Sequence, residues 1–259
     1  MLAGYLRELL FTFMLGAISV QLHAVDNPGP SGIFEQGACI ECHEKDNPQL
    51  IKDWRNSIHA SEQPVADCVA CHGKLHQHTA STARHDSACI TCHGGEKSPV
   101  VHSYITSKHG VLVRLEKDTY DWEQPLVMAN YRSPGCSYCH MHNAGHNVNS
   151  AREKVSAVCQ DCHAPRYITS LSTNGERMLE IARKKVREAE TTVTQAATVF
   201  SDNELAPARI ILETMQQHLK NVYLGIGHQS PDYQWWHGQP ALDGDLLRIK
   251  GHIGDLYRK

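Results

Sequence analysis

The sequence predicts a mainly α-helical protein, in which a core with little regular structure precedes a long C-terminal helical hairpin. Three observations predict this class. Glycine and proline interrupt residues 27–166 at short intervals, all ten cysteines lie in that stretch, and apolar residues recur at helical spacing between 179 and 226. We therefore expect one domain at residues 25–168 and a helical region, used for packing or oligomerisation, at residues 169–259.

The first segment, residues 1–24, is typical of a secretory signal peptide. Arg7 precedes an apolar run from Leu9 to Val20, and Ala24 suits cleavage. An uncleaved anchor is the alternative, but the run is shorter than the roughly 20 residues of a comfortable membrane span. The pattern therefore predicts an exported protein.

The cysteines of the next segment fall in five copies of one pentapeptide, C-x-x-C-H. The ten thiols are those of Cys39, Cys42, Cys68, Cys71, Cys89, Cys92, Cys136, Cys139, Cys159 and Cys162. The histidines that end the copies are His43, His72, His93, His140 and His163. In C-x-x-C-H the two thiols attach one haem, and the histidine binds its iron as proximal ligand. Zinc ribbons and disulfide scaffolds need no histidine after each pair, so the sequence predicts five covalent haems c.

Five haems in about 140 residues leave little room for an ordinary apolar core. The porphyrin faces would then provide much of the buried apolar area, with short helices and loops between them. Haem is attached to such motifs outside the bacterial cytoplasm, which agrees with the signal peptide and predicts a periplasmic bacterial protein. A formal net charge of -3 without a basic tract argues against nucleic acid and anionic membrane surfaces as partners.

The C-terminal region changes character. Thr173 and Glu176 have capping-box spacing, which predicts a helix start. The first apolar stripe that follows consists of Leu179, Ala182, Val186, Ala189, Val193, Ala196 and Phe200. After the cap and turn residues of 201–207, the second stripe consists of Ala208, Leu212, Met215, Leu219, Val222 and Ile226. Both stripes predict a hairpin that packs on itself, and a subunit interface is the alternative.

The sixth ligand of each iron decides the chemistry, because a second histidine saturates the iron whereas an open position binds small molecules. Beyond the motifs and His23, the chain has twelve further histidines, enough to saturate five irons. They are His59, His76, His78, His85, His102, His109, His142, His146, His218, His228, His237 and His252. No motif reads C-x-x-C-K, so a lysine-ligated catalytic haem is not indicated.

Several landmarks besides the motifs resemble the octahaem hydroxylamine oxidoreductase family. They are Trp54–Ala60, Ser107–Gly110, Tyr131–His146, Val158–Arg166 and the closing His228–Gly238, on a chain with five haem motifs instead of eight. The resemblance implies that His59, His109, His146 and His228 are distal iron ligands. It also makes Tyr233 a candidate for the tyrosine that family enzymes cross-link to the catalytic porphyrin of a neighbouring subunit. No Asp-His pair of the kind found in the family's active site is recognisable in the sequence.

The segment His228–Gly238 has three interpretations from the sequence. His228 or His237 binds an iron, Tyr233 clamps the helical region on the haem core together with Trp235 and Trp236, or Tyr233 is catalytic. The first two are compatible.

The leading functional hypothesis is an electron carrier with closely packed, mostly bis-histidine haems, working between periplasmic or membrane-bound redox proteins. Two alternatives stay open. One is an enzyme that oxidises hydroxylamine, or reduces nitrite or hydroxylamine, at one open haem. The other is a subunit of a haem filament. The helical region favours a homo-oligomer, with a trimer as the arrangement that the resemblance implies.

Overall fold

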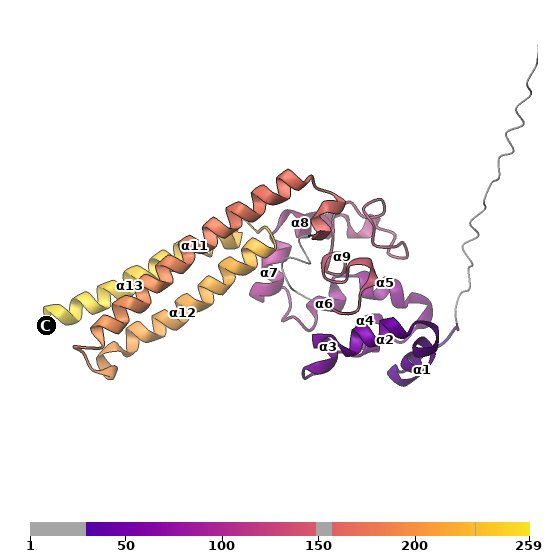
Figure 1. Ribbon diagram of the computed structural model, residues 1–259, viewed down its shortest axis with the longest axis horizontal. Helices are drawn as coiled ribbons and strands as arrows, with labels where there is room; N and C mark the ends of the chain where they lie inside the picture. Colours follow the sequence, from indigo (N-terminus) through magenta and orange to yellow (C-terminus); the bar gives the residue numbers. More distant parts are fainter. Residues whose placement is uncertain (1–29, 149–156, 231) are drawn as a thin grey trace, which may run out of the picture.

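The computed structural model describes residues 30–148, 157–230 and 232–259, and only the backbone of Trp235 and Trp236 (Figure 1). The predicted signal peptide lies outside these residues. The described chain folds into helices, with one isolated bridge between Ile33 and Leu75. It has two parts: a lobe of short helices and a three-helix bundle that extends away from it (Figure 1).

The lobe consists of short helices joined by loops. Its α-helices are α1 (Gln36–Asp46), α2 (Pro48–Arg55), α3 (Ile58–Ser61), α4 (Cys68–His72), α5 (Thr79–Arg84), α6 (Ser87–Ile90), α7 (Pro99–Ile105), α8 (Lys108–Glu116) and α9 (Cys136–His140). Its 3₁₀ turns are η1 (His76–His78), η2 (Lys117–Thr119), η3 (His142–Ala144) and η4 (Cys159–Asp161). The predicted core with little regular structure is confirmed.

Short polar residues determine where several lobe helices begin. Asn47, Asp67, Ser98 and Ser107 each accept a hydrogen bond from the backbone N–H three residues further on. Such caps satisfy one of the free donors of the first helical turn. The caps at Asp67 and Ser107 hold the helices that carry the second C-x-x-C-H motif and His109.

The bundle is made of α11 (Pro165–Ala196), α12 (Asp202–Gly227) and α13 (Gln239–Arg258), which all pack against one another. A π-helical turn, η5 (Asp232–Trp236), precedes α13. The turn between α11 and α12 and the C-terminus both lie at the end far from the lobe (Figure 1).

Both predicted apolar stripes form the core of the bundle and are confirmed. The buried residues of this core are Leu179, Ala182, Val186, Ala189, Val193, Ala196, Leu205, Ala208, Met215, Val222, Ile226, Leu242, Ile249 and Ile253. The remaining stripe residues, Phe200, Leu212 and Leu219, are partly buried and pack against it. Each helix therefore buries one face against the other two.

The start of the bundle differs from the prediction. The capping box at Thr173 and Glu176 is wrong as a helix start, because α11 begins at Pro165 and these residues lie inside it. Proline suits the first helical position, since its fixed φ is already helical and its missing N–H has no partner there. Residue 169, the expected domain boundary, also lies inside α11. The second helix does begin with a capping box, formed by Ser201 and Glu204.

Candidate haem-binding site

The five C-x-x-C-H motifs lie on or beside short helices of the lobe. The first motif is inside α1, the second forms α4 and the fourth forms α9. The third motif begins in α6 and ends in the turn after it, and the fifth begins in η4. Each thiol pair therefore lies within about one turn of its own histidine.

Each motif histidine has one partner histidine at nearly the same distance. The ring centroids are 6.4 Å apart for His43–His76, 5.8 Å for His72–His146, 6.2 Å for His93–His59, 6.5 Å for His140–His228 and 6.0 Å for His163–His109. Two imidazoles on opposite sides of one iron, each at a metal–nitrogen distance of about 2 Å, have ring centroids about 6 Å apart. The five pairs therefore have the spacing of axial ligands.

All four distal candidates from the sequence fall in these pairs. His59, His109, His146 and His228 each lie beside a different motif histidine. The fifth partner, His76, was not among them. His59 and His109 each follow a serine by two positions, whereas His76 does not, and the only sign of His76 in the sequence was its presence among the twelve further histidines.

Hydrogen bonds fix the tautomer of two of the paired histidines. The Nδ1 atom of His72 lies 2.9 Å from the carbonyl oxygen of Thr79, and that of His146 lies 2.8 Å from the carbonyl oxygen of Ala144. A carbonyl oxygen only accepts, so each Nδ1 carries the proton and each Nε2 keeps a free lone pair. Metal-bound histidines are oriented in this way, and the donor set therefore fits a haem iron.

Burial keeps several of these imidazoles neutral, which is the form that binds a metal. Burial is the largest cause of a lowered pKa at His59, His72, His109, His140 and His228. The effect is large at His228, where burial, and to a smaller extent the neighbouring His140, lowers the pKa to about 4.

Consecutive motifs are neighbours in space. Helix α1 contacts α4, and α4 contacts α6. The backbone N–H of Cys136 in the fourth motif donates a 2.7 Å hydrogen bond to Oδ1 of Asp86, the residue directly before α6, in which the third motif begins. The fourth and fifth are joined by a 3.1 Å bond from the hydroxyl of Tyr138 to Asp161 Oδ2. The motifs therefore follow one another through the lobe in chain order.

Tyr233 lies at the junction between the lobe and the bundle. Its side chain is buried, with its ring centroid 5.5 Å from that of His102 on α7 and 6.1 Å from that of His237. Asp232 lies between these two histidines, 2.8 Å from His237 Nδ1 and 3.9 Å from His102 Nδ1. Neither histidine belongs to the five pairs, so the contacts of Tyr233 are those of a packing residue.

The histidines outside the pairs have partners of other kinds. His78 contacts Glu123, the His85 ring contacts the Trp122 ring at a tilted angle, His142 lies near Asp161, His218 bonds Asp245, and His252 bonds the carbonyl oxygen of Glu204. Within the described ranges, no group of three or more His, Cys, Asp or Glu could hold a metal ion. Pairs are what a haem requires, since the porphyrin nitrogens occupy the other four positions.

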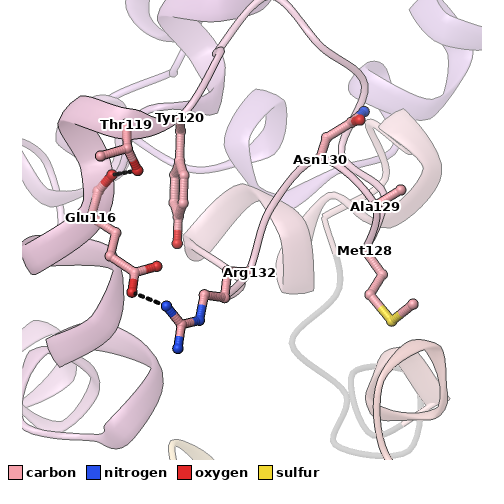
Figure 2. Close-up of a pocket in the computed structure, with 7 residues that line it drawn as sticks. All are labelled: Glu116, Thr119, Tyr120, Met128, Ala129, Asn130 and Arg132. Atoms are coloured by element: carbon pink, nitrogen blue, oxygen red, sulfur yellow. Dashed lines mark hydrogen bonds and ion pairs between the residues drawn. The ribbon is translucent and has the colours of Figure 1, made fainter.

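A cavity of about 600 Å³ lies beside the loop before the fourth motif. Its lining residues are Glu116, Thr119, Tyr120, Met128, Ala129, Asn130 and Arg132 (Figure 2). Figure 2 shows the Glu116 carboxylate facing the Arg132 guanidinium, with which it forms an ion pair of 2.9 Å. None of the motif cysteines or paired histidines lines this cavity.

The family described as "Seven times multi-haem cytochrome CxxCH" matches residues 51–157. One curated relative is the "Probable nitrite reductase-hydroxylamine oxidoreductase fusion protein" of Kuenenia stuttgartiensis, 36% identical over 139 residues, or 40% of this chain and 16% of the relative. Another is "Multiheme cytochrome MtrA" of Shewanella baltica (strain OS185), which is 26% identical over 164 residues, or 55% of this chain and 48% of the relative. The chain thus spans less than half the length of either.

Two solved structures share the fold. The "Kuenenia stuttgartiensis reducing HAO-like protein complex Kustc0457/Kustc0458" gives a TM-score of 0.51 at 17% identity, over 86% of this chain and 85% of that one. A "Hypothetical multiheme protein" gives a TM-score of 0.55 at 16% identity, over 75% of this chain and 58% of that one. Residues 51–157 therefore match a multihaem c-type cytochrome family, and the chain is similar to multihaem proteins in sequence and in fold. One of the two curated relatives is a probable hydroxylamine oxidoreductase fusion protein, and one of the two structures is an HAO-like complex, so the predicted resemblance is confirmed.

Among the described residues, no helix is both long enough and apolar enough to cross a membrane.

Proposed function

We propose that the protein transfers electrons through five covalently attached haems c, each held between a motif histidine and one partner histidine. The observation that carries this proposal is the set of five histidine pairs, in which the ring centroids lie 5.8 to 6.5 Å apart. An iron with two histidine ligands has no free position for a substrate, and it changes only its charge when it accepts an electron. Saturated irons therefore suit electron transfer.

The arrangement of the motifs supports a row of neighbouring haems along which electrons pass, here called the wire. Consecutive motif helices contact one another or share hydrogen bonds, so neighbouring haems would lie close enough for electrons to pass in the order of the sequence. The ends of the wire would then be the haem at Cys39–His43 and the haem at Cys159–His163. Redox proteins at these ends, in the periplasm of a bacterium, are the partners that we propose.

The first test is low-temperature EPR of the purified, oxidised protein, with a haem count from the pyridine adduct. We expect five haems per chain and low-spin signals alone, because all five motif histidines have a partner. A stoichiometric high-spin signal that changes on addition of nitrite or hydroxylamine would contradict the electron-transfer proposal.

A second candidate function is an enzyme that oxidises hydroxylamine, or reduces nitrite or hydroxylamine, at one open haem. Its support is the 36% identity with a probable nitrite reductase-hydroxylamine oxidoreductase fusion protein. Under this alternative, Tyr233→Phe changes the optical spectrum of one haem. Under the electron-transfer proposal, the variant keeps the spectrum, because the ring of Tyr233 faces His102 and His237.

The quaternary structure is part of the proposal. The bundle carries exposed apolar side chains outside its core, among them Ile181, Ile210 and Leu247, and we propose a homo-oligomer formed through the bundle. Sedimentation of the haem-loaded protein tests it, with a trimer as the expected species.

A further inference from the structure

One histidine pair joins the two parts of the molecule. Four of the pairs lie entirely between residues 43 and 163, whereas His140 of the lobe is paired with His228, which caps the C-terminal end of α12. The orientation of the His228 ring is therefore determined by contacts between the bundle and the lobe. Those contacts come from α7, which packs directly against α12.

Ser103 on α7 makes the contact with the His228 ring. Its hydroxyl donates to the carbonyl oxygen of Val100 at 2.9 Å and lies 2.7 Å from His228 Nδ1. A serine hydroxyl has one proton, and the carbonyl can only accept it. The hydroxyl oxygen must therefore accept a hydrogen bond from the Nδ1–H of His228, which leaves Nε2 directed to the iron.

This contact differs from those of the other paired histidines. His72 and His146 bond backbone carbonyl oxygens, whereas His228 is the one described member of the pairs whose ring nitrogen bonds a side chain. Ser103 is 0% exposed, so water does not compete for the bond. A single substitution can therefore remove it.

We propose that Ser103 is a positioning residue for the fourth haem, which fixes the tautomer of His228 and lowers the reduction potential of that iron. The proposal rests on ligation of the iron by His228, as proposed above. A hydrogen bond from Nδ1–H to an acceptor makes the ligating nitrogen a stronger donor. A stronger donor stabilises ferric iron relative to ferrous iron, so the bond lowers the potential.

A second hydroxyl contact at the same junction provides the control. Thr106 Oγ1 lies 2.9 Å from Ser230 Oγ, also between α7 and the segment after α12, but it touches no paired histidine. Thr106→Val therefore weakens the docking of the bundle without changing the hydrogen bond of His228. An effect of docking alone would appear in Thr106→Val as well as in a variant that lacks the Ser103 hydroxyl.

The experiment is an EPR-monitored redox titration of the full-length, haem-loaded protein and of Ser103→Ala, Ser103→Thr and Thr106→Val. In Ser103→Ala we expect one of the five midpoint potentials to rise. The lost hydrogen bond changes the oxidised-to-reduced ratio at a fixed potential about threefold to tenfold, which is about 30 to 60 mV for one electron. Ser103→Thr, which restores the hydroxyl, and Thr106→Val should keep all the wild-type potentials.

Unchanged potentials in Ser103→Ala would overturn the inference, and so would an equal shift of the same haem in Thr106→Val. A Ser103→Ala protein that loses the low-spin signal of one haem while Ser103→Thr keeps it supports the positioning role. Loss in both variants counts against it. The wild-type spectrum separates the two proposals, because low-spin signals alone support histidine ligation whatever Ser103→Ala does.

Discussion

At the residue scale, one 3₁₀ turn carries two histidines with different surroundings. In η1, the ring centroid of His76 lies 6.4 Å from that of the motif histidine His43. The side chain of His78 is largely exposed and contacts Glu123. The two are the same residue type, two positions apart. Only packing over long sequence distances distinguishes them.

This difference gives a matched pair of variants. His76→Ala should convert one low-spin haem to high-spin, since it removes the sixth ligand of the iron held by His43. His78→Ala should keep the wild-type EPR spectrum. Equal spectra of the two variants would show that His76 binds no iron.

The same contrast explains what the sequence could predict at this scale. The motif cysteines and histidines were recognisable because haem attachment is a local chemistry with fixed spacing. The partners were not assignable to individual irons, because each pair joins distant segments, as His72 and His146 do. The family resemblance identified His59 and His109 through the serine two positions before each of them, whereas His76 has no such serine.

At the scale of the elements, the bend between α7 and α8 depends on a glycine. A Cβ at Gly110 would lie 2.2 Å from the carbonyl oxygen of Tyr104 and 2.7 Å from the Cα of Ile105, both backbone atoms. The two helices therefore meet too closely for any side chain here. Because Gly110 follows His109 directly, the close approach also determines where that histidine lies.

Gly110→Ala should therefore lower the stability of the lobe by about 1–3 kcal/mol, the usual cost of overpacking, and disturb the low-spin signal of the fifth haem. Thermal unfolding followed in the Soret band and EPR measure these effects. Gly37→Ala on α1, where a Cβ meets nothing within 4 Å, is the control and should be neutral or stabilising. A Gly110→Ala protein as stable as Gly37→Ala would contradict the steric argument.

The third bundle helix, α13, was not predicted from the sequence, which indicated a hairpin. Its buried face includes Leu242, Ile249 and Ile253, but also Asp245, which is 0% exposed. A charged residue on the buried face breaks the apolar periodicity that revealed the other two helices. Asp245 is tolerated there because His218 and Arg248 bond its carboxylate.

Asp245→Asn should destabilise the bundle by about 1–3 kcal/mol, because it replaces the buried carboxylate that His218 and Arg248 bond with a neutral amide. The exposed Asp255 forms the same i,i+3 ion pair, with Arg258, on the same helix. Asp255→Asn is therefore the matched control and should cost less than about 1 kcal/mol. Urea unfolding followed by far-ultraviolet circular dichroism compares them, and equal midpoints would show that burial of Asp245 contributes nothing.

At the scale of the whole molecule, the lobe and the bundle are held together by different means. The bundle has an apolar core of its own, whereas the described lobe buries few large side chains and depends on the haems proposed for its interior. The two meet where α12 contacts α7, where Tyr233 of η5 contacts His102 of α7, and where His228 lies beside His140. The fourth haem would therefore be attached covalently to the lobe, and the bond from its iron to His228 would hold the bundle against the lobe.

This arrangement predicts that His228→Ala loosens the junction selectively. Loss of the iron–histidine bond should make amide hydrogens of residues 225–230 exchange at least about tenfold faster, equivalent to about 1.4 kcal/mol of local stability. Amides around the turn at Ser201, at the far end of the bundle, should exchange at the wild-type rate, because the core between them is unchanged. Hydrogen–deuterium exchange with mass spectrometry measures both regions in the haem-loaded protein.

His252→Ala is the control for this measurement, since His252 bonds the backbone of Glu204 within the bundle and lies away from the lobe. Faster exchange at residues 225–230 in both variants, or in neither, would show that the junction is held by side-chain packing alone. Faster exchange in His228→Ala only, together with loss of one low-spin signal, would show that one bond to iron connects electron transfer in the lobe with the position of the bundle.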